Sequence, residues 1–201
     1  MLSRARRRRL AAHSATCVAG VALAAAPAAT AADVGAPEVP VPLPPGAAPP
    51  AVPHAAASGA CGGAGARAGQ ASATAMRRAL HCLLDRQRAR HGRHSLGADR
   101  RLGRAARRHA ADMARRHYFS HISPSGSSPL ARARAAGWHG AVGEAIAWGC
   151  GELSTPAATM RAWMASRPHR AILLGPAHAV GIGFKRASGC GGRGYWVVDV
   201  G

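Results

Sequence analysis

Acidic residues and lysine are scarce in this chain of 201 residues. Eight Asp and Glu residues stand against 27 Lys and Arg residues, and Lys185 is the one lysine, so the formal net charge is +19 with the histidines neutral. Such a charge favours contact with polyanions, namely anionic cell-wall polymers, lipid headgroups or nucleic acid. An excess of Arg, Ala and Gly is also what a GC-rich genome encodes, so composition alone does not identify a polyanion as the partner.

Three local motifs of catalytic or metal-binding sites are missing from the sequence. The lack of a C-x-x-C pair argues against a zinc knuckle and against a thioredoxin-type redox site. The lack of H-E-x-x-H argues against two zinc-binding histidines on adjacent turns of one helix. No G-x-S-x-G is present, so the serine nucleophile of the common hydrolases is not indicated.

The first 31 residues have the pattern of a secretory signal peptide. Four arginines at 6–9 precede an apolar stretch at 10–32, which contains the small residues Ala29-Thr30-Ala31. A basic region, an apolar region and a small-residue cleavage site define such a signal. An uncleaved membrane anchor, a lipoprotein signal at Cys17 and a twin-arginine signal are the alternatives. After removal of residues 1–31 we expect no membrane span, a net charge of about +14, and a secreted, extracellular or cell-wall-associated protein.

The cysteines that remain after this removal support export. Their even number predicts two disulfides with three possible pairings, of which we favour Cys61–Cys82 and Cys150–Cys190. A helical wheel places Cys82 away from the apolar side of its helix, where it can tether the preceding segment. That segment, 32–69, is rich in Pro, Ala and Gly and predicts an extended linker.

The remaining residues, 70–201, predict a domain of the α+β class. Helical spacing of apolar residues begins near Thr74 and ends at His91-Gly92. Asp99 is a candidate N-cap for a second helix, and Thr155-Pro156 begins a third. The β-prone segments 179–184 and 195–198 are separated by a Gly-rich turn and predict a hairpin. Helices followed by a terminal hairpin indicate a layered α+β domain.

Titratable side chains occur among small or apolar neighbours in three segments of the second half. These are His121 in Tyr118-Phe119-Ser120-His121, Glu144 in Gly143-Glu144-Ala145-Ile146-Ala147-Trp148-Gly149, and His169 after Ala162-Trp163-Met164-Ala165-Ser166. With the closing Tyr195-Trp196-Val197-Val198-Asp199-Val200-Gly201, this ordered set resembles the CAP superfamily of cysteine-rich secretory, antigen 5 and pathogenesis-related 1 proteins, in its short bacterial, SCP-like form.

The resemblance implies an α-β-α sandwich, with a small antiparallel sheet between helical layers. It also implies a cleft lined by His121, Glu144 and His169. Ser166 stands at the position where the family has a second acidic residue. Ala145 and Ile172 replace two asparagines of the family pattern, which removes hydrogen-bonding groups beside the cleft.

Two imidazoles and a carboxylate can hold Zn²⁺ with one open position, with His121 and His169 as the histidine ligands. They can equally form a buried polar network without metal. The three residues lie 23 and 25 positions apart, which does not favour a metal. The altered surroundings favour a secreted, non-enzymatic binding or cell-surface module for a small apolar ligand, a glycan or a protein. A metal-assisted, peptidase-like hydrolase and a basic binder of cell-wall polyanions are the alternatives, and an exported chain makes nucleic acid a poor partner.

Overall fold

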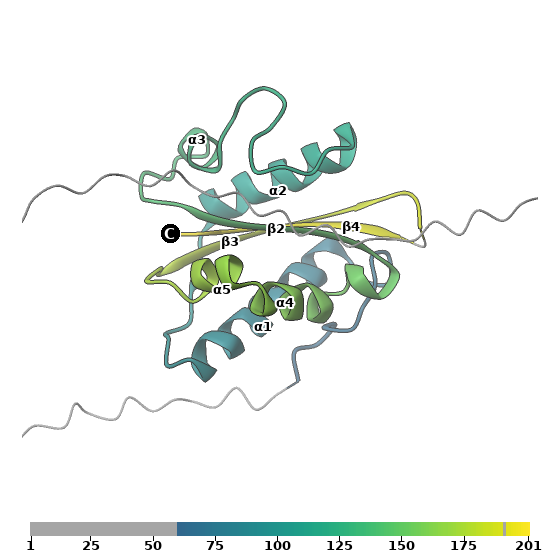
Figure 1. The fold of residues 1–201 in the computed structure, drawn as a ribbon, viewed down its shortest axis with the longest axis horizontal. Helices are drawn as coiled ribbons and strands as arrows, with labels where there is room; N and C mark the ends of the chain where they lie inside the picture. The colour runs from purple at the N-terminus through teal and green to yellow at the C-terminus, as the bar shows by residue number, and fades with distance from the viewer. Residues whose placement is uncertain (1–59, 191) are drawn as a thin grey trace, which may run out of the picture.

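A four-stranded sheet lies between two layers of helices. The computed structural model describes residues 60–190 and 192–201, so the predicted signal peptide and most of the predicted linker lie outside the described residues. The elements in chain order are α1 (Ala73–Arg90), β1 (Gly97–Ala98), α2 (Arg100–Arg116), α3 (Pro129–Ala135), β2 (Gly143–Cys150), the 3₁₀ helix η1 (Gly151–Ser154), α4 (Pro156–Ala165), α5 (Arg167–Leu173), β3 (Ala179–Ala187) and β4 (Arg193–Val200). Helices α2 and α3 cover one face of the sheet, and α1, α4 and α5 cover the other (Figure 1). The predicted α-β-α sandwich of the α+β class is confirmed.

The strands follow the order β1-β3-β4-β2, so β4 is central and β2 forms one edge of the sheet. The predicted hairpin is confirmed, because β3 and β4 pair antiparallel with Ile182 opposite Val198. Strand β2 also pairs antiparallel with β4, and Glu144 lies opposite Asp199. The two residues of β1 pair with β3 in the parallel direction, so the sheet is mixed where an antiparallel one was expected.

The predicted helix ends depend on capping side chains. The carboxylate of Asp99 accepts hydrogen bonds from the backbone N–H groups of Arg101 and Leu102 at the start of α2. The Thr155 hydroxyl accepts from Ala158 N–H at the start of α4, and Pro156 follows at a position whose missing N–H has no partner in a helix. Helix α1 ends at the expected place, with His91 as its C-cap. Capping interactions between residues close in sequence therefore set the boundaries of these helices.

Helix α2 lies unusually close to β3 because two glycines of the strand face it. A Cβ on Gly181 would be 2.1 Å from the carbonyl carbon of Leu102, and a Cβ on Gly183 would be 2.2 Å from the carbonyl oxygen of Ala106. The helix presents small or apolar side chains on this side, and these are almost completely buried: Leu102, Ala105, Ala106, Ala110 and Met113. The helix backbone thus rests on the strand with almost no side chains between them.

The larger core lies on the other face of the sheet, under α1 and α4. Its buried members include Met76, Leu80, Leu84, Met160, Trp163, Ile182, Phe184, Trp196 and Val198. Both fully buried tryptophans also satisfy their indole N–H groups: Trp163 donates to the carbonyl of Ile146 at 3.1 Å, and Trp196 donates to that of Ser154 at 3.2 Å. Such pairing removes the cost of burying an N–H group.

A buried guanidinium joins α1 to two loops. Arg88 is 2% exposed, and it donates to the carbonyl oxygens of His94 (2.7 Å), Leu173 (2.7 Å), Gly175 (3.1 Å) and Ala177 (3.2 Å). Burial lowers the pKa of this group, and the nearby charge of Arg93 lowers it further. The carbonyl dipoles of the loop between α5 and β3 therefore take the place of a carboxylate partner.

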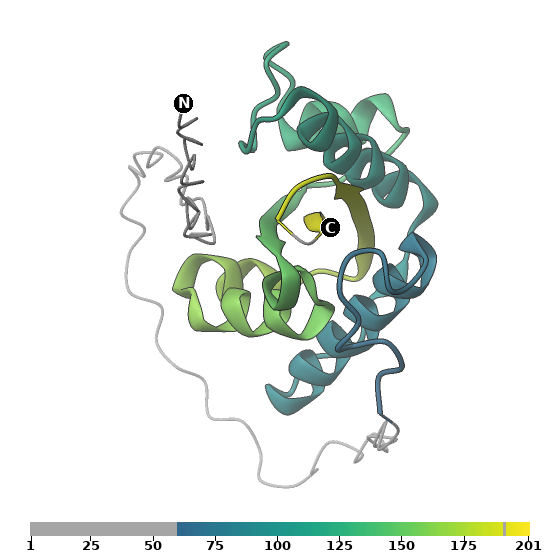
Figure 2. The same cartoon turned by 90° about the vertical axis from the view of Figure 1, so that its right-hand side faces the viewer.

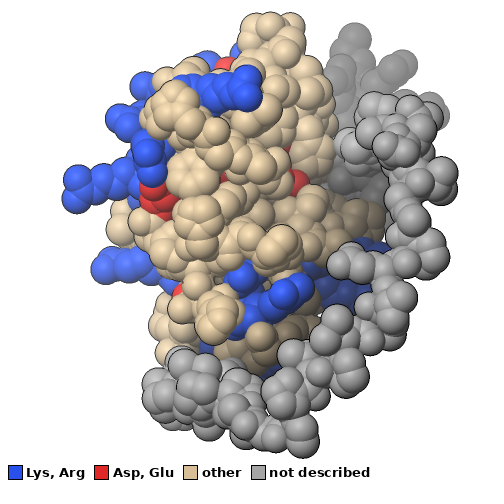
Figure 3. All heavy atoms as spheres, turned by 90° about the vertical axis from the view of Figure 1, so that its left-hand side faces the viewer, with Lys and Arg blue, Asp and Glu red and all other residues tan. Residues whose placement is uncertain are grey.

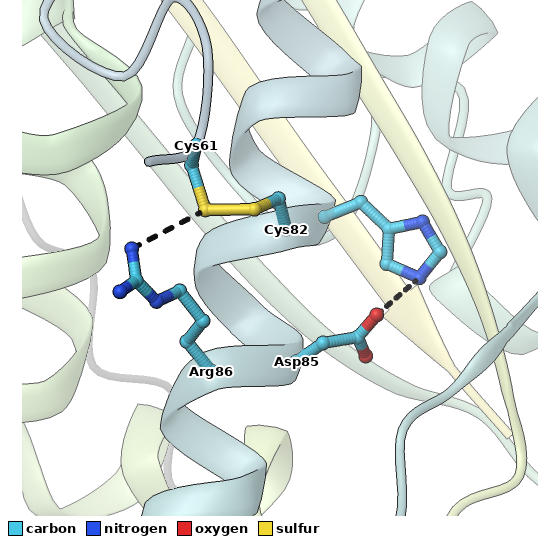
Figure 4. The surroundings of a disulfide bond; sticks show 5 residues. Cys61, Cys82, Asp85 and Arg86 are labelled. Carbon is cyan, nitrogen blue, oxygen red and sulfur yellow. Dashed lines mark hydrogen bonds and ion pairs between the residues drawn. A yellow bond between two sulfur atoms is a disulfide. The ribbon is translucent and has the colours of Figure 1, made fainter. Parts of the chain in front are cut away.

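Both predicted disulfides are confirmed, Cys61–Cys82 and Cys150–Cys190. The first ties the segment before α1 to the helix itself, and the Arg86 Nη1 lies 4.0 Å from the Cys61 sulfur (Figure 4). The second ties the end of β2 to the turn between β3 and β4. Three further contacts fix residues 64–68 to η1 and α4: Ala157 N–H to the Ala64 carbonyl, Ala68 N–H to Ser154 Oγ, and an ion pair between Arg67 and Glu152.

None of the helices within residues 60–190 and 192–201 combines the length and the apolar character needed to cross a membrane.

The contact between α2 and β3 predicts a strong effect of one added methyl group. Gly183→Ala should destabilise the domain by about 2–3 kcal/mol, because the new Cβ must displace the α2 backbone. Gly62→Ala is the matched control, since a Cβ there would meet no atom within 4 Å. Urea denaturation of both variants measures the difference, and equal stability of the two would contradict the close packing.

Candidate functional site

His121 and Glu144 form a hydrogen-bonded pair beside the β2 edge of the sheet. His121 lies in the loop after α2, and Glu144 is the second residue of β2. The imidazole Nδ1 lies 2.7 Å from Glu144 Oε1, and it donates its proton to the carboxylate. The side chain of Glu144 is 2% exposed and that of His121 is 17% exposed. Solvent therefore reaches the imidazole but hardly reaches the carboxylate.

Arg132 of α3 binds the other oxygen of the same carboxylate. Its Nη2 donates to Glu144 Oε2 at 2.6 Å, and its Nη1 donates to the carbonyls of His121 (2.9 Å) and Ser127 (2.6 Å). The guanidinium thus holds the carboxylate and the backbone of the loop that carries the imidazole. Sequence reasoning missed this residue, although Ser128-Pro129 before it has the same helix-start pattern as Thr155-Pro156.

These contacts keep Glu144 ionised. Burial raises the pKa of its carboxyl group, but the hydrogen bond from His121 and the charge of Arg132 more than offset this effect. The pKa of Glu144 therefore lies below its usual value. Both carboxylate oxygens are already engaged, which leaves Glu144 poorly placed to accept a proton from a substrate.

Asp199 is a second buried carboxyl group next to Glu144. The two residues are directly opposite on β4 and β2, so their side chains share one face of the sheet. Asp199 is 1% exposed, and its Oδ1 has no hydrogen-bond partner within the described part of the chain. Burial raises the pKa of this group well above its usual value, and the negative charge of Glu144 raises it further. The sequence signal that could have identified Asp199 as a site residue is its position as an acidic residue within the apolar run Val197 to Val200.

His109 contributes a buried imidazole to the same region. Its Nε2 donates to the carbonyl of Ser120 at 3.0 Å, one residue before His121. Burial lowers the pKa of His109, while the charge of Glu144 opposes this effect. His117, on the same helix, ends α2 in a left-handed conformation and is exposed. Of these two histidines, the buried one, His109, is therefore the one whose pKa is influenced by the carboxylate of Glu144.

His169 and Ser166 form a separate pair at the start of α5. The His169 Nδ1 lies 2.7 Å from Ser166 Oγ. Ser166 is the N-cap residue of α5 and His169 is the third residue of the helix, but the Ser166 hydroxyl accepts no backbone N–H of α5, so this bond joins two side chains only. Burial lowers the pKa of His169, and the nearby charge of His121 lowers it further. No hydrogen bond among the described residues joins this pair to Glu144.

The donor arrangement does not fit the zinc site considered for His121, Glu144 and His169. Within residues 60–190 and 192–201, no three His, Cys, Asp or Glu side chains are grouped so that they could hold a metal ion. Glu144 uses one oxygen for His121 and the other for Arg132, and the Nδ1 atom of His169 is engaged by Ser166. We therefore assign no chemical step to a metal at this position.

An open hollow of about 260 Å³ lies between the end of the sheet and α5. Its walls are mainly apolar and consist of Ala141, Val142, Gly143, Ala171, Ile172, Gly175, Pro176, Ala177, Val200 and Gly201. Gly143 makes close packing possible here, because a Cβ at this position would be 2.9 Å from Ile172 Cγ2. One lining residue, Gly143, directly precedes Glu144 in β2. Two others, Ala171 and Ile172, belong to α5, the helix that contains His169.

The buried ion pair predicts unequal effects for two arginines of the same helix. Arg132→Met should destabilise the domain by about 3–5 kcal/mol, because it leaves the buried Glu144 without its cation. Arg134→Met should change the stability by about 0.5 kcal/mol or less, since Arg134 is exposed. Thermal or urea unfolding of both variants tests this, and a similar small loss in both would show that the ion pair contributes little.

The raised pKa of Asp199 predicts a specific pH dependence. A carboxyl group that holds its proton more tightly in the folded chain stabilises the fold below the unfolded pKa of 3.8 and loses this contribution as the pH rises. Asp199→Asn removes that loss, so the stability of the variant relative to the parent should be greater at pH 7 than at pH 4. Urea denaturation at both pH values measures the difference, with the exposed Glu152→Gln as control. A pH-independent difference would contradict the shift.

Comparisons with known proteins agree with this architecture. The model of the "CAP: Cysteine-rich secretory protein family" matches residues 77–200. The uncharacterized protein YkwD of Bacillus subtilis is 32% identical over 116 residues, which are 57% of this chain and 44% of that protein. An extracellular protein of Bacillus anthracis that contains an SCP domain has a similar fold, with a TM-score of 0.52 and 22% identity over 65% of this chain and 43% of its own.

An outer surface protein of Borrelia burgdorferi has a TM-score of 0.55 and 18% identity, and the match covers 65% of this chain and 95% of that protein. The chain thus covers less than half of the length of both Bacillus relatives. The family model, in contrast, matches more than half of the chain, including the segments that carry His121, Glu144 and His169. The chain belongs to the CAP, or cysteine-rich secretory protein, family.

Proposed function

We propose that this protein is an extracellular, non-enzymatic binding module for a small ligand with an apolar part. The apolar part enters the hollow beside α5, and a polar group of the ligand reaches the imidazoles of His169 and His121. The observation that carries this proposal is the apolar lining of the hollow, which includes Gly143, the residue before Glu144, and Ala171, two residues after His169. Pockets of this kind combine apolar walls with a few polar groups that orient the ligand.

The state of the polar residues supports binding rather than hydrolysis. A hydrolase needs a general base that is free to take a proton, but both oxygens of Glu144 are engaged. The hydrogen bond between the Ser166 hydroxyl and the His169 imidazole resembles a nucleophile with its base, but such a pair also needs a third group that orients the base. No third side chain among the described residues forms a hydrogen bond with the remaining nitrogen of His169, as an orienting group would.

One of the two substitutions at family positions contributes to the apolar lining of the hollow. Ile172, in place of an asparagine of the family pattern, is one of the lining residues and packs near Gly143. Ala145, in place of the other asparagine, is fully buried in the core. An amide at the fully buried Ala145 position would need hydrogen-bond partners inside the core. Ile172 presents an apolar side chain to the hollow and therefore favours an apolar group over a polar substrate there.

Filling the hollow should abolish binding of an apolar probe. We expect the full chain to bind a short-chain fluorescent fatty acid, and Ala171→Phe to weaken this binding by about tenfold or more, which is about 1.4 kcal/mol. Ala171 lines the hollow but is exposed, so the larger side chain can be accommodated without disturbing the core. Fluorescence titration measures both affinities.

Ala162→Phe is the matched control, because Ala162 is also an exposed helical alanine and is not part of the hollow. Its affinity for the probe should equal that of the parent. Equal affinities of all three proteins would place the probe elsewhere and contradict the proposal, as would a parent that does not bind the probe.

A further inference from the structure

Helices α1 and α2 both contact β3, from opposite faces of the sheet, near the edge that is farther from β2 and Glu144. Strand β3 is covered by β1 only at Ala179 and Val180, so beyond these residues the two helices flank its edge. Both helices lie on the same side of the molecule when it is viewed along the sheet (Figure 2). Burial lowers the pKa of Arg77 on α1, and the charge of Arg107 on α2 lowers it further. Arg77 and Arg107 thus belong to helices that flank this edge from opposite faces of the sheet, and Arg107 lies beside β3, since a Cβ on Gly183 would be 2.8 Å from its backbone nitrogen.

Two more cations come from the strand itself. Gly181, Gly183 and Lys185 alternate along β3 toward α2, so Lys185 continues the row of residues that meets the helix near Arg107. Arg186 points to the opposite face, where its guanidinium lies against Gly69, just before α1. Lys185, Arg186 and Arg107 are exposed. We call Arg77, Arg107, Lys185 and Arg186 the basic seam.

The basic seam has no counter-charge within the described residues. None of its cations lies within 4.0 Å of a carboxylate oxygen there. Asp99 and Asp112, the acidic residues nearest in sequence on α2, are paired with Arg101, Arg115 and Arg116. Seen from the left-hand side of Figure 1, the surface shows many Lys and Arg side chains and only a few small acidic patches (Figure 3). An anionic ligand would relieve the repulsion between these neighbouring cations.

We propose that the basic seam is a binding site for a linear, phosphate-bearing polymer. Arginine donates paired hydrogen bonds that match a phosphate group, and four cations spread over two helices and a strand suit a chain of several phosphates. A bilayer surface fits less well, because binding to it combines cations with exposed apolar side chains. The exposed large apolar residues of the described part, Ile122 and Leu153, flank β2 at the other edge of the sheet.

This site is independent of the hollow, since β4 separates β3 from β2. Its test is a titration of the full chain with linear inorganic polyphosphate over a range of salt concentrations. Arg107→Gln with Lys185→Gln should weaken binding by roughly tenfold or more at low salt, and should reduce the slope of log K against log salt by about one for each lost phosphate contact. The control is Arg134→Gln with Arg161→Gln, which removes the same charge from exposed positions on α3 and α4.

The control should bind within about twofold of the parent, because its charges act only through the screened long-range field. Equal weakening in both double variants would show that net charge alone attracts the polymer, and would overturn the site. Vesicles of phosphatidylglycerol form the second arm. Tighter binding to vesicles than to polyphosphate, lost in the seam variant, would assign the cations to a membrane surface and would also overturn the proposal. A circular dichroism melt of each variant confirms that it is folded.

Discussion

The arrangement of this domain depends on the direct contact between the α2 backbone and β3. Gly181 and Gly183 have no side chains, so the helix lies on the strand at a distance that any larger residue would prevent. The position of α2 in turn determines two separate features. On its sheet-facing side it carries His109, which binds the carbonyl of Ser120 next to His121, and at the edge of β3 it carries Arg107 beside Gly183. One backbone contact therefore orients both a neutral imidazole and a guanidinium.

The polar residues around Glu144 form a support for the loop that carries His121. Arg132 binds the carboxylate and two carbonyls of that loop, and His121 binds the carboxylate from the other side. Such a network is costly to bury unless its members are paired. Both oxygens of Glu144 are paired, whereas Arg132 Nε has no hydrogen-bond partner within the described residues. Asp199 adds a carboxyl group whose pKa is raised by burial and by the charge of Glu144. The chemistry of the region thus favours a fixed shape over proton transfer.

Much of the fold could be predicted because local signals determine it. Asp99 and Thr155 mark helix starts, and the hairpin follows from two β-prone runs around a Gly-rich turn. The family resemblance located His121 and Glu144, which the structure brings together. Arg132 could not be identified from the sequence, because no local motif distinguishes it from the many other arginines. Its role depends on how α3 is folded over β2. Likewise, the bond from His169 to Ser166 depends on the break between α4 and α5, which sequence spacing did not reveal.

Arg88 has a consequence for how tightly a ligand can be held. Its guanidinium binds the carbonyls of Leu173, Gly175 and Ala177, and the last two residues form a wall of the hollow. Movement of that wall would leave a buried cation without its acceptors, so the wall is held in one conformation before any ligand arrives. Because association is weakened by the entropy lost when loops become ordered, a preorganised wall lets a small contact area yield useful affinity. Affinity at this hollow would then be governed by a residue that never touches the ligand.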